Sequence, residues 1–270
     1  MIEMLKAVIL GIVQGITEWL PVSSTGHLIL VEQFVKFNLT DVFVSTFMVV
    51  IQLGSILAVL TLYFRKLNPL DNSKTEKEKR ATIDLWLKVI VAVIPSAILG
   101  FLFDDAIDAL FFNPTTVSIT LILYGVIMII LENRNKKPIV SDFSQLTYKL
   151  AIGIGIFQCL ALIPGTSRSG ATIIGAVFLG ASRYIAAEFS FFLAIPTMFG
   201  ASGLKLLKTG ASFSGFEWGV IGVGFVTAFI VSVFAIKFLM DYIKKHDFKA
   251  FGYYRIVLGI IVLAYFNFIL

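Results

Sequence analysis

Two short polar segments in an otherwise apolar chain hold the side chains that could do chemistry. Residues 14–27 read QGITEWLPVSSTGH and residues 158–172 read QCLALIPGTSRSGAT. Each segment follows an apolar run, contains a proline and enters a turn rich in hydroxyl groups and glycine. Together they supply a carboxylate, an imidazole, an arginine and a row of hydroxyls, which suit the binding of an anion and the transfer of protons. Polar groups inside a membrane are costly and are functional by default.

In the first segment, Gln14 and Glu18 are four residues apart, so a helix places both on one face, where they can address one ligand. His27 follows the Ser-Ser-Thr-Gly turn and is a candidate general acid or base. Ser24 is a candidate nucleophile that His27 would activate, and attack by water is equally compatible with these residues. The structural alternatives are a backbone contact for Gln14, a cation partner for Glu18 and a structural hydrogen bond for His27.

The second segment places Arg168 between two serines, at a turn that starts a helix. A guanidinium and the free N–H groups of a helix N-terminus both favour an anion such as phosphate. An arginine at mid-bilayer costs roughly 2.5–3.5 kcal/mol on insertion scales, so it needs a partner, either Glu18 or a phosphate. The structural alternative is an Arg168–Glu18 pair that only joins the two segments. The residues expected to bind phosphate are Ser23, Thr25, Ser167, Arg168, Ser169, Gly170 and Thr172.

The composition places these segments in a membrane protein. Of 270 residues, 58% are hydrophobic and only 14% are charged, with a mean hydropathy of +0.92, whereas soluble domains average about 25% charged residues. Apolar runs of about 20 residues recur, which predicts membrane-spanning helices. The net charge of +5 lies in loops, so we expect no nucleic-acid partner. The single cysteine, Cys159, allows no disulfide within the chain.

The pattern predicts an all-α polytopic membrane protein that forms one domain over residues 1–270. The expected full spans are 43–64, 82–103, 115–132, 184–207, 217–240 and 252–270. Two further pairs of apolar segments, 2–20 with 26–37 and 148–163 with 169–180, are too short and too broken to span separately. We expect each pair to form a re-entrant hairpin that dips into the membrane and returns.

The two halves read as a repeat. A shift of 144 residues aligns Gly11 with Gly155, Gln14 with Gln158, and the serines and glycines of the two turns. Repeat 1 covers about 1–135 and repeat 2 about 148–270, each with one hairpin and three spans. An odd number of spans makes the halves inverted across the membrane, an arrangement that places broken-helix sites near the midplane.

Loop charges predict the orientation. Loops 65–81, 133–149 and 241–251 are rich in Lys and Arg, and by the positive-inside rule they are cytoplasmic. The alternate loops hold Asp104, Asp105 and Asp108, or only Lys205 and Lys208. Both termini are then external, and the two hairpins enter from opposite sides so that their turns meet within the membrane.

At this point the residues resemble a known family. GITEWLPVSSTGH and LIPGTSRSGAT resemble the two signature segments of the bacterial undecaprenyl-diphosphatases, also called bacitracin-resistance proteins. EFSFFLAIP at 188–196 and VVIQLGSILAV at 49–59 are similar to that family too, and the resemblance covers essentially the whole chain.

The resemblance implies hydrolysis of undecaprenyl diphosphate, a polyprenyl lipid, to the monophosphate carrier of cell-wall synthesis. It implies a multi-pass protein of the bacterial plasma (inner) membrane, an active site towards the outer face, a divalent cation (Mg²⁺ or Ca²⁺), and bacitracin that competes for the substrate. The family has Glu or Gln four residues before its second motif Glu. This chain has Gln14 before Glu18, so the expected metal ligands are one carboxylate and one amide oxygen.

Two other functions are compatible with parts of the pattern. A lipid-phosphate transporter or flippase could use the same anion site, because inverted repeats with broken helices are common in transporters. A second lipid-phosphatase superfamily has a PSGH motif, which STGH partly matches. That superfamily also requires His and Asp after its Ser-Arg pair, where this chain has Ile174 and Phe178, so this alternative fails. The residues leave the oligomeric state open, a homodimer included.

Overall fold

The computed structural model describes residues 1–209 and 213–268, without the side chains at positions 104, 105, 108, 205, 208 and 209. The predicted external charges Asp104, Asp105, Asp108, Lys205 and Lys208 therefore lie outside the described side chains. The regular secondary structure of the described residues is helical, apart from one isolated bridge between Val140 and Ala181. Its α-helices are α1 (Ile2–Thr17), α2 (Ser24–Phe34), α3 (Asp41–Leu62), α4 (Phe64–Leu67), α5 (Glu76–Phe111), α6 (Pro114–Asn133), α7 (Tyr148–Cys159), α8 (Arg168–Phe178), α9 (Arg183–Thr209), α10 (Gly215–Tyr242) and α11 (Lys249–Phe268). Two 3₁₀ turns, η1 (Phe143–Gln145) and η2 (Leu160–Leu162), precede and follow α7.

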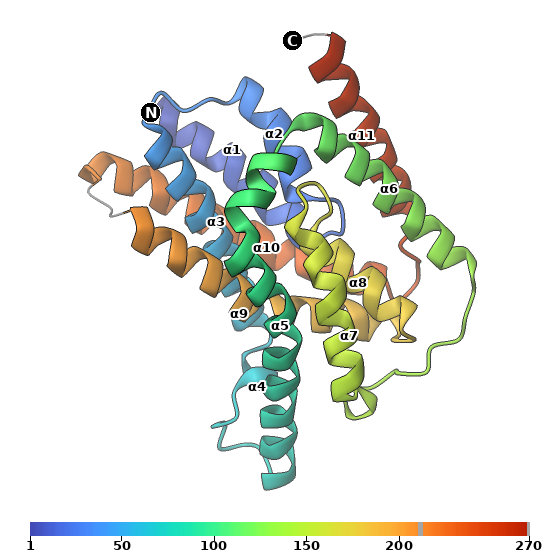
Figure 1. Cartoon of the computed structure of the whole chain (residues 1–270). Helices are drawn as coiled ribbons and strands as arrows, with labels where there is room; N and C mark the ends of the chain where they lie inside the picture. Colours follow the sequence, from blue (N-terminus) through green and yellow to red (C-terminus); the bar gives the residue numbers. More distant parts are fainter. Residues whose placement is uncertain (210–212, 269–270) are drawn as a thin grey trace.

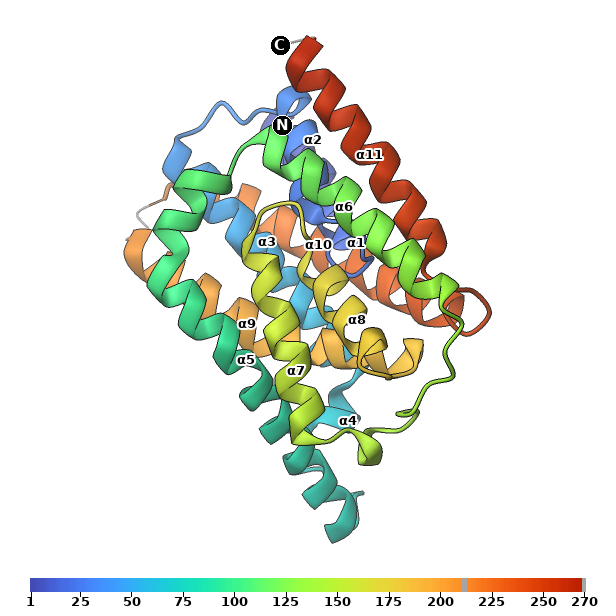
Figure 2. The same cartoon turned by 45° about the vertical axis from the view of Figure 1, so that its right-hand side comes forward.

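Six described helices, α3, α5, α6, α9, α10 and α11, are long and apolar enough to cross a membrane. They match the six predicted spans, so the prediction of an all-α polytopic membrane protein is confirmed. The two predicted hairpins are also present as the short helix pairs α1/α2 and α7/α8. Figure 1 shows both termini at one end of the molecule and α4 with the start of α5 at the other, and Figure 2 agrees.

Several helix boundaries differ from the predictions. α1 ends at Thr17 instead of residue 20, because Pro21 disfavours helical backbone in the residue before it and has no N–H to donate. α5 has 36 residues and begins and ends outside the predicted 82–103. No glycine or proline follows residue 103 until Pro114, so nothing local ends α5 earlier.

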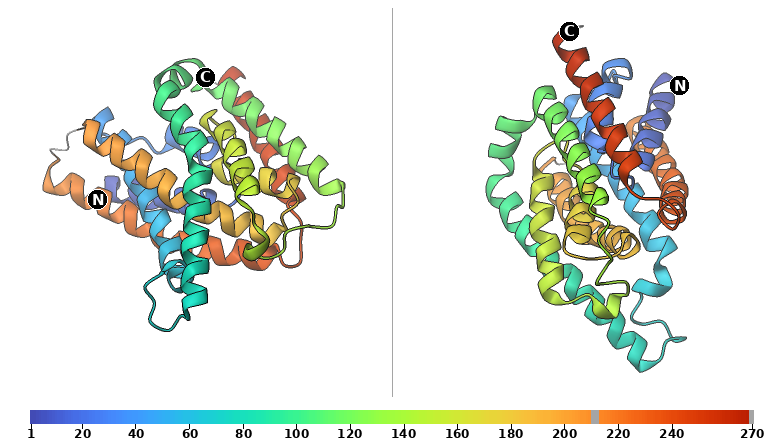
Figure 3. Two further views of the ribbon diagram at one scale, coloured as in Figure 1. Left: turned by 60° about the horizontal axis from the view of Figure 1, so that its bottom comes forward. Right: turned by 90° about the vertical axis from the view of Figure 1, so that its right-hand side faces the viewer.

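Each short hairpin packs on a long helix from the other half of the chain. α1 lies against α10, and α7 lies against α5. Gly155 allows the second contact, since a Cβ there would lie 2.0 Å from the carbonyl oxygen of Ala92. Small residues let membrane helices approach this closely. Figure 3 shows α6 and α11 side by side at one edge of the bundle.

Candidate functional site

The site is built from the connections inside the two hairpins. We call residues 18–23, between α1 and α2, the first tip, and residues 163–167, between η2 and α8, the second tip. Ser23 and Ser167 end the two tips with φ angles of 73° and 71°, a region that non-glycine residues rarely adopt. Each serine caps the next helix, accepting from the N–H of Gly26 at 3.3 Å and of Gly170 at 3.1 Å. The tips therefore start α2 and α8 in the same way.

Glu18 is the acceptor that joins the two tips. Its carboxylate is 7% exposed and lies 3.2 Å from Nη2 of Arg168. The other carboxylate oxygen accepts from the amide of Gln14 at 3.1 Å and from the hydroxyl of Ser24 at 3.2 Å. Four predicted site residues, 14, 18, 24 and 168, are thus brought together from both halves of the chain.

Arg168 is almost completely enclosed, with 11% of its side chain exposed. Besides Glu18, it donates from Nη1 to the carbonyl oxygen of Ser190 at 2.9 Å, and its guanidinium lies 5.8 Å from the ring of Trp19. Its Nε–H is buried and has no hydrogen-bond partner in the described residues. A buried donor without a partner is costly, so this N–H is available for an anion.

Two of the predicted phosphate-binding hydroxyls hold the protein together in this structure. Ser169 donates to the carbonyl oxygens of Glu18 at 3.1 Å and Leu20 at 3.3 Å, which fastens α8 to the first tip. Thr172 donates to the carbonyl of Arg168 at 2.9 Å, and its hydroxyl also lies in hydrogen-bond contact with the Ser190 hydroxyl at 2.7 Å. Both hydroxyls are buried, so they fix the position of Arg168 here.

The remaining predicted phosphate ligands line the starts of the two helices. Ser167 contacts the hydroxyl of Ser169 at 3.1 Å, and Thr25 lies in the first turn of α2. The N-termini of α2 and α8 carry free N–H groups and the positive ends of their helix dipoles.

His27 has a defined hydrogen-bonding pattern. Its Nδ1 lies 2.7 Å from the carbonyl oxygen of Ser23, which can only accept, so Nδ1 carries a proton. In the neutral ring, Nε2 then accepts from the hydroxyl of Tyr254 at 2.6 Å. We expected His27 to be the base for Ser24, yet the hydroxyl of Ser24 donates to Glu18 instead. The structure therefore gives Ser24 a different nearest base.

The oxygen atoms near Glu18 bear on the implied metal ion. No group of three or more His, Cys, Asp or Glu side chains is found in the described part of the chain. The buried Oε1 of Gln14, however, has no hydrogen-bond partner there, while its Nε2 donates to Glu18. A carboxylate and an amide oxygen are both ligands that Mg²⁺ accepts. The Gln14 amide would have to turn for its Oε1 to face the same ion as Glu18, because Nε2 faces the carboxylate here.

The sequence reasoning overlooked Arg255 and Tyr254 of α11. Arg255 is completely buried and Tyr254 contacts His27. A charged residue inside the expected span 252–270 was a usable signal for Arg255, because such residues rarely face lipid without a role. Nothing in the sequence pattern pairs Tyr254 with His27.

Two of the ion pairs away from the tips join different helices. Glu188 of α9 binds Lys66 of α4 at 2.6 Å. Arg183 forms a bidentate pair with Glu132 that joins α9 to α6. Both pairs join helix ends, and neither touches Glu18 or Arg168.

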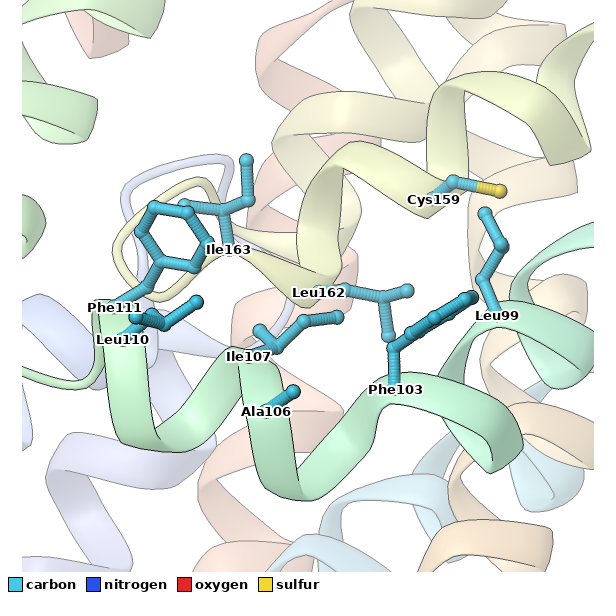
Figure 4. A pocket seen from close by; sticks show the side chains of 9 residues that line it. All are labelled: Leu99, Phe103, Ala106, Ile107, Leu110, Phe111, Cys159, Leu162 and Ile163. Atoms are coloured by element: carbon cyan, nitrogen blue, oxygen red, sulfur yellow. The ribbon is translucent and has the colours of Figure 1, made fainter.

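An apolar groove of about 360 Å³ runs along the outside of the second tip. Figure 4 shows the side chains from the end of α5 facing those of α7 and the tip. Its lining residues are Leu99, Phe103, Ala106, Ile107, Leu110, Phe111, Cys159, Leu162 and Ile163. Every side chain among these described lining residues is apolar or a cysteine.

The fold is that of a polytopic α-helical membrane protein, and the tips of its two short hairpins meet at the buried Arg168–Glu18 pair. The chain matches the model of the family described as bacitracin resistance protein BacA over residues 7–261, and it belongs to that family. It is 72% identical over 266 residues to undecaprenyl-diphosphatase 1 of Clostridioides difficile strain 630, covering 98% of this chain and 97% of the relative. It is 60% identical to undecaprenyl-diphosphatase of Acetivibrio thermocellus, covering 98% of each chain. A third relative, undecaprenyl-diphosphatase of Enterococcus faecalis, is 57% identical over 97% of this chain and 96% of its own.

Proposed function

We propose that the protein hydrolyses undecaprenyl diphosphate to undecaprenyl phosphate and inorganic phosphate, which recycles the lipid carrier of cell-wall synthesis. The observation that carries this proposal is the contact of Arg168, at the start of α8, with Glu18, whose carboxylate also accepts from Ser24 at the start of α2. An anion site enclosed by membrane helices suits a substrate with an apolar body and a phosphate head. The relatives named undecaprenyl-diphosphatase support the same reaction.

In the proposed mechanism, Arg168 and the N–H groups that begin α8 hold the diphosphate. The unpartnered Nε–H of Arg168 donates to a phosphate oxygen without breaking an existing bond. The positive charge stabilises the negative charge that develops on the transferred phosphoryl group. Ser23, Thr25, Ser167 and Gly170 complete the phosphate-binding surface, and Ser169 and Thr172 hold Arg168 in place beside it.

Two attacking groups fit the geometry. In one route Ser24 attacks the terminal phosphorus, the anhydride P–O bond breaks, and undecaprenyl phosphate leaves; water then hydrolyses the phosphoserine. The proton of Ser24 passes to Glu18, its hydrogen-bond partner, or to His27. In the other route a water molecule attacks directly and gives its proton to Glu18 or His27. Both routes use Arg168 in the same role.

We propose that a divalent cation binds beside these groups, with Glu18 and Gln14 as its protein ligands. When bound, the ion would neutralise phosphate charge and orient the diphosphate. Gln14 contributes only its carbonyl oxygen, so we propose that most of the remaining coordination comes from substrate and water. The unsatisfied Oε1 of Gln14 supports this assignment.

We further propose that the protein resides in the bacterial plasma membrane with the site open towards the outer face. The Lys and Arg residues of loops 65–81, 133–149 and 241–251 support a cytoplasmic position for these loops by the positive-inside rule. Bacitracin would then compete for undecaprenyl diphosphate, in keeping with the name of the family.

The test is phosphate release from undecaprenyl diphosphate by the purified protein in detergent, with and without a chelator. We expect turnover by the wild type, loss on chelation that added Mg²⁺ restores, and loss in Arg168→Ala. A flippase would use the same anion site without breaking a bond. Lipid translocation in vesicles without phosphate release would therefore overturn the proposal in favour of transport.

A further inference from the structure

Arg255 of α11 is a buried arginine whose hydrogen-bond partners are main-chain carbonyls. Its exposed fraction is 0%. The guanidinium donates to the carbonyl oxygen of Gly165 at 3.0 Å and of Pro21 at 3.3 Å, and approaches those of Thr120 and Leu121 at 3.5 Å. None of the ion pairs among the described side chains includes Arg255. Its role is therefore different from that of Arg168.

The four carbonyls belong to three separate parts of the chain. Pro21 lies in the first tip, Gly165 lies in the second tip, and the other two carbonyls belong to α6. Pro21 is three residues after Glu18, and Gly165 is three residues before Arg168. The Arg255 side chain thus connects the two tips, and each contact lies three residues from one partner of the Arg168–Glu18 pair.

The second tip packs closely against α6 at this point. Gly165 has a φ of 86°, and a Cβ there would lie 2.2 Å from Oγ1 of Thr120. The same Oγ1 donates to the carbonyl of Pro164 at 2.8 Å. Thr120 and Arg255 therefore fasten adjacent carbonyls of the second tip to α6 and α11.

We propose that Arg255 is a positioning residue that holds the two tips in register so that Glu18 and Arg168 meet. The planar guanidinium carries five donors that point in different directions, whereas a lysine ammonium presents three donors from one atom. Only the guanidinium can satisfy carbonyls from both tips and from α6 together. The catalytic consequence of this role rests on the proposed phosphatase function.

Trp19 reports on the first tip without any substrate. It lies in that tip, is completely buried, and packs edge-on against Phe191 at 5.3 Å between ring centroids. Replacing Trp86 and Trp218 with Phe leaves Trp19 as the single tryptophan. If Arg255→Lys releases the tip, the emission of Trp19 shifts to longer wavelength and acrylamide quenches it more strongly.

The kinetic measurement separates positioning from phosphate binding. With undecaprenyl diphosphate as substrate, we expect Arg255→Lys to lower kcat on the order of 10–10²-fold, the scale for a small misplacement of catalytic groups. KM should change by less than about threefold, because the binding groups remain and only their arrangement for reaction is lost. The lysine keeps the positive charge, so a lowered kcat in Arg255→Lys would show that charge alone does not fill the role of the guanidinium.

The matched control is Arg183→Lys, in the pair that joins α9 to Glu132. It should lower the melting temperature in detergent without changing kcat or the emission of Trp19. If replacing any arginine by lysine had the same general effect, kcat and Trp19 emission would change in Arg183→Lys as they do in Arg255→Lys.

Three results would overturn the proposal. Normal kcat and normal Trp19 emission in Arg255→Lys would mean that only the charge matters. A raised KM with unchanged kcat would make Arg255 a phosphate-binding group. If Arg255→Lys fails to melt cooperatively, Thr120→Val loosens the same tip, and normal kcat in that variant would reject positioning through the tip. Because the Trp19 measurement needs no turnover, an inactive wild type would reject the proposed function and leave the test of positioning intact.

Discussion

Glu18 and Arg168 form a buried ion pair, so replacing either residue changes the stability of the protein as well as its activity. A buried ion pair loses stability when one partner is removed, by about 3–5 kcal/mol, because the remaining charge has no compensation. Stability must therefore be measured beside activity in any variant of this pair. The extra contacts of Glu18 with Gln14 and Ser24 reduce the loss by retaining donors around the carboxylate.

We predict that Arg168→Ala lowers turnover by at least about 10²–10³-fold, the scale for losing one donor to transition-state charge. Arg168→Lys should not restore turnover, since one ammonium cannot replace contacts to Glu18, the Ser190 carbonyl and a phosphate oxygen together. Phosphate release by folded variants is the measurement. Near-normal turnover of Arg168→Lys would show that the charge alone suffices.

The hydrogen bond of Ser24 leads to a second prediction. Residues that share a hydrogen bond show non-additive effects, whereas residues without a shared partner come closer to additivity. We expect Ser24→Ala combined with Glu18→Gln to be little worse than either change alone. Ser24→Ala combined with His27→Ala should be closer to additive, because His27 bonds to Ser23 and Tyr254 instead.

Double-mutant cycles on kcat decide between these pairings. Strong coupling between Ser24 and His27 would restore the assignment of His27 as the base for the serine. A substantial rate in folded Ser24→Ala that still depends on His27 would remove the serine nucleophile and leave water as the attacking group.

Among the structural elements, the short helices α2 and α8 matter most, since each has only 11 residues and is preceded by an N-cap serine at positive φ. Such backbone conformations cost of order 1–3 kcal/mol and persist where the surrounding contacts hold them. For α8 those contacts come from Ser169 and Thr172, and they fix the helix against the first tip and α9.

The packing of α7 on α5 gives an element-scale prediction. Gly155→Ala would place a methyl group against the backbone of Ala92, which cannot move aside as a flexible side chain does. We expect a loss of stability of about 1–3 kcal/mol, the usual cost of overpacking, together with lower turnover because the second tip shifts. Gly222→Ala is the control, since no atom lies within 4 Å of the added Cβ.

Thermal unfolding in detergent and phosphate release measure the two effects. If Gly155→Ala melts like the wild type, α7 and α5 can move apart to accept the methyl group, and the prediction is wrong. If Gly222→Ala also loses stability, the effect belongs to any methyl group added to these helices.

For the whole molecule, the order of elements and their contacts support the proposal of an inverted repeat. Each half contains a short hairpin followed by three long helices. The first hairpin packs on the second long helix of the other half, α10, and the second hairpin packs on its counterpart, α5. The inversion across the membrane stays a prediction from the sequence.

Single-cysteine labelling tests the orientation. In a Cys159→Ala background, Lys77→Cys should react with an impermeant thiol reagent only after the cells are opened, because the loop is predicted to be cytoplasmic. Lys36→Cys, exposed on the connection between α2 and α3, should react in intact cells. Labelling of position 77 in intact cells would reverse the orientation.

The sequence by itself determined the class of protein, the order of hairpins and spans, and the two segments that form the site. These features depend on hydropathy, proline and glycine, which act over a few neighbouring residues. The pairing of Arg168 with Glu18 was also predictable, because a buried charge requires an opposite charge and the tips offered one. The end of α5 at Phe111 was not predicted, because the predicted span stopped where hydropathy falls, and no proline or glycine ends the helix there.

Only the tertiary structure decided which groups the site residues contact. The hydroxyl of Tyr254 meets His27 across 227 residues of chain, and no local pattern links them. Arg255 binds main-chain carbonyls, which every residue possesses, so the sequence cannot mark its partners. The bond of Ser24 to Glu18 depends on how the first tip folds back on α1. Such contacts arise from the packing of distant helices, and that packing sets the geometry of the site.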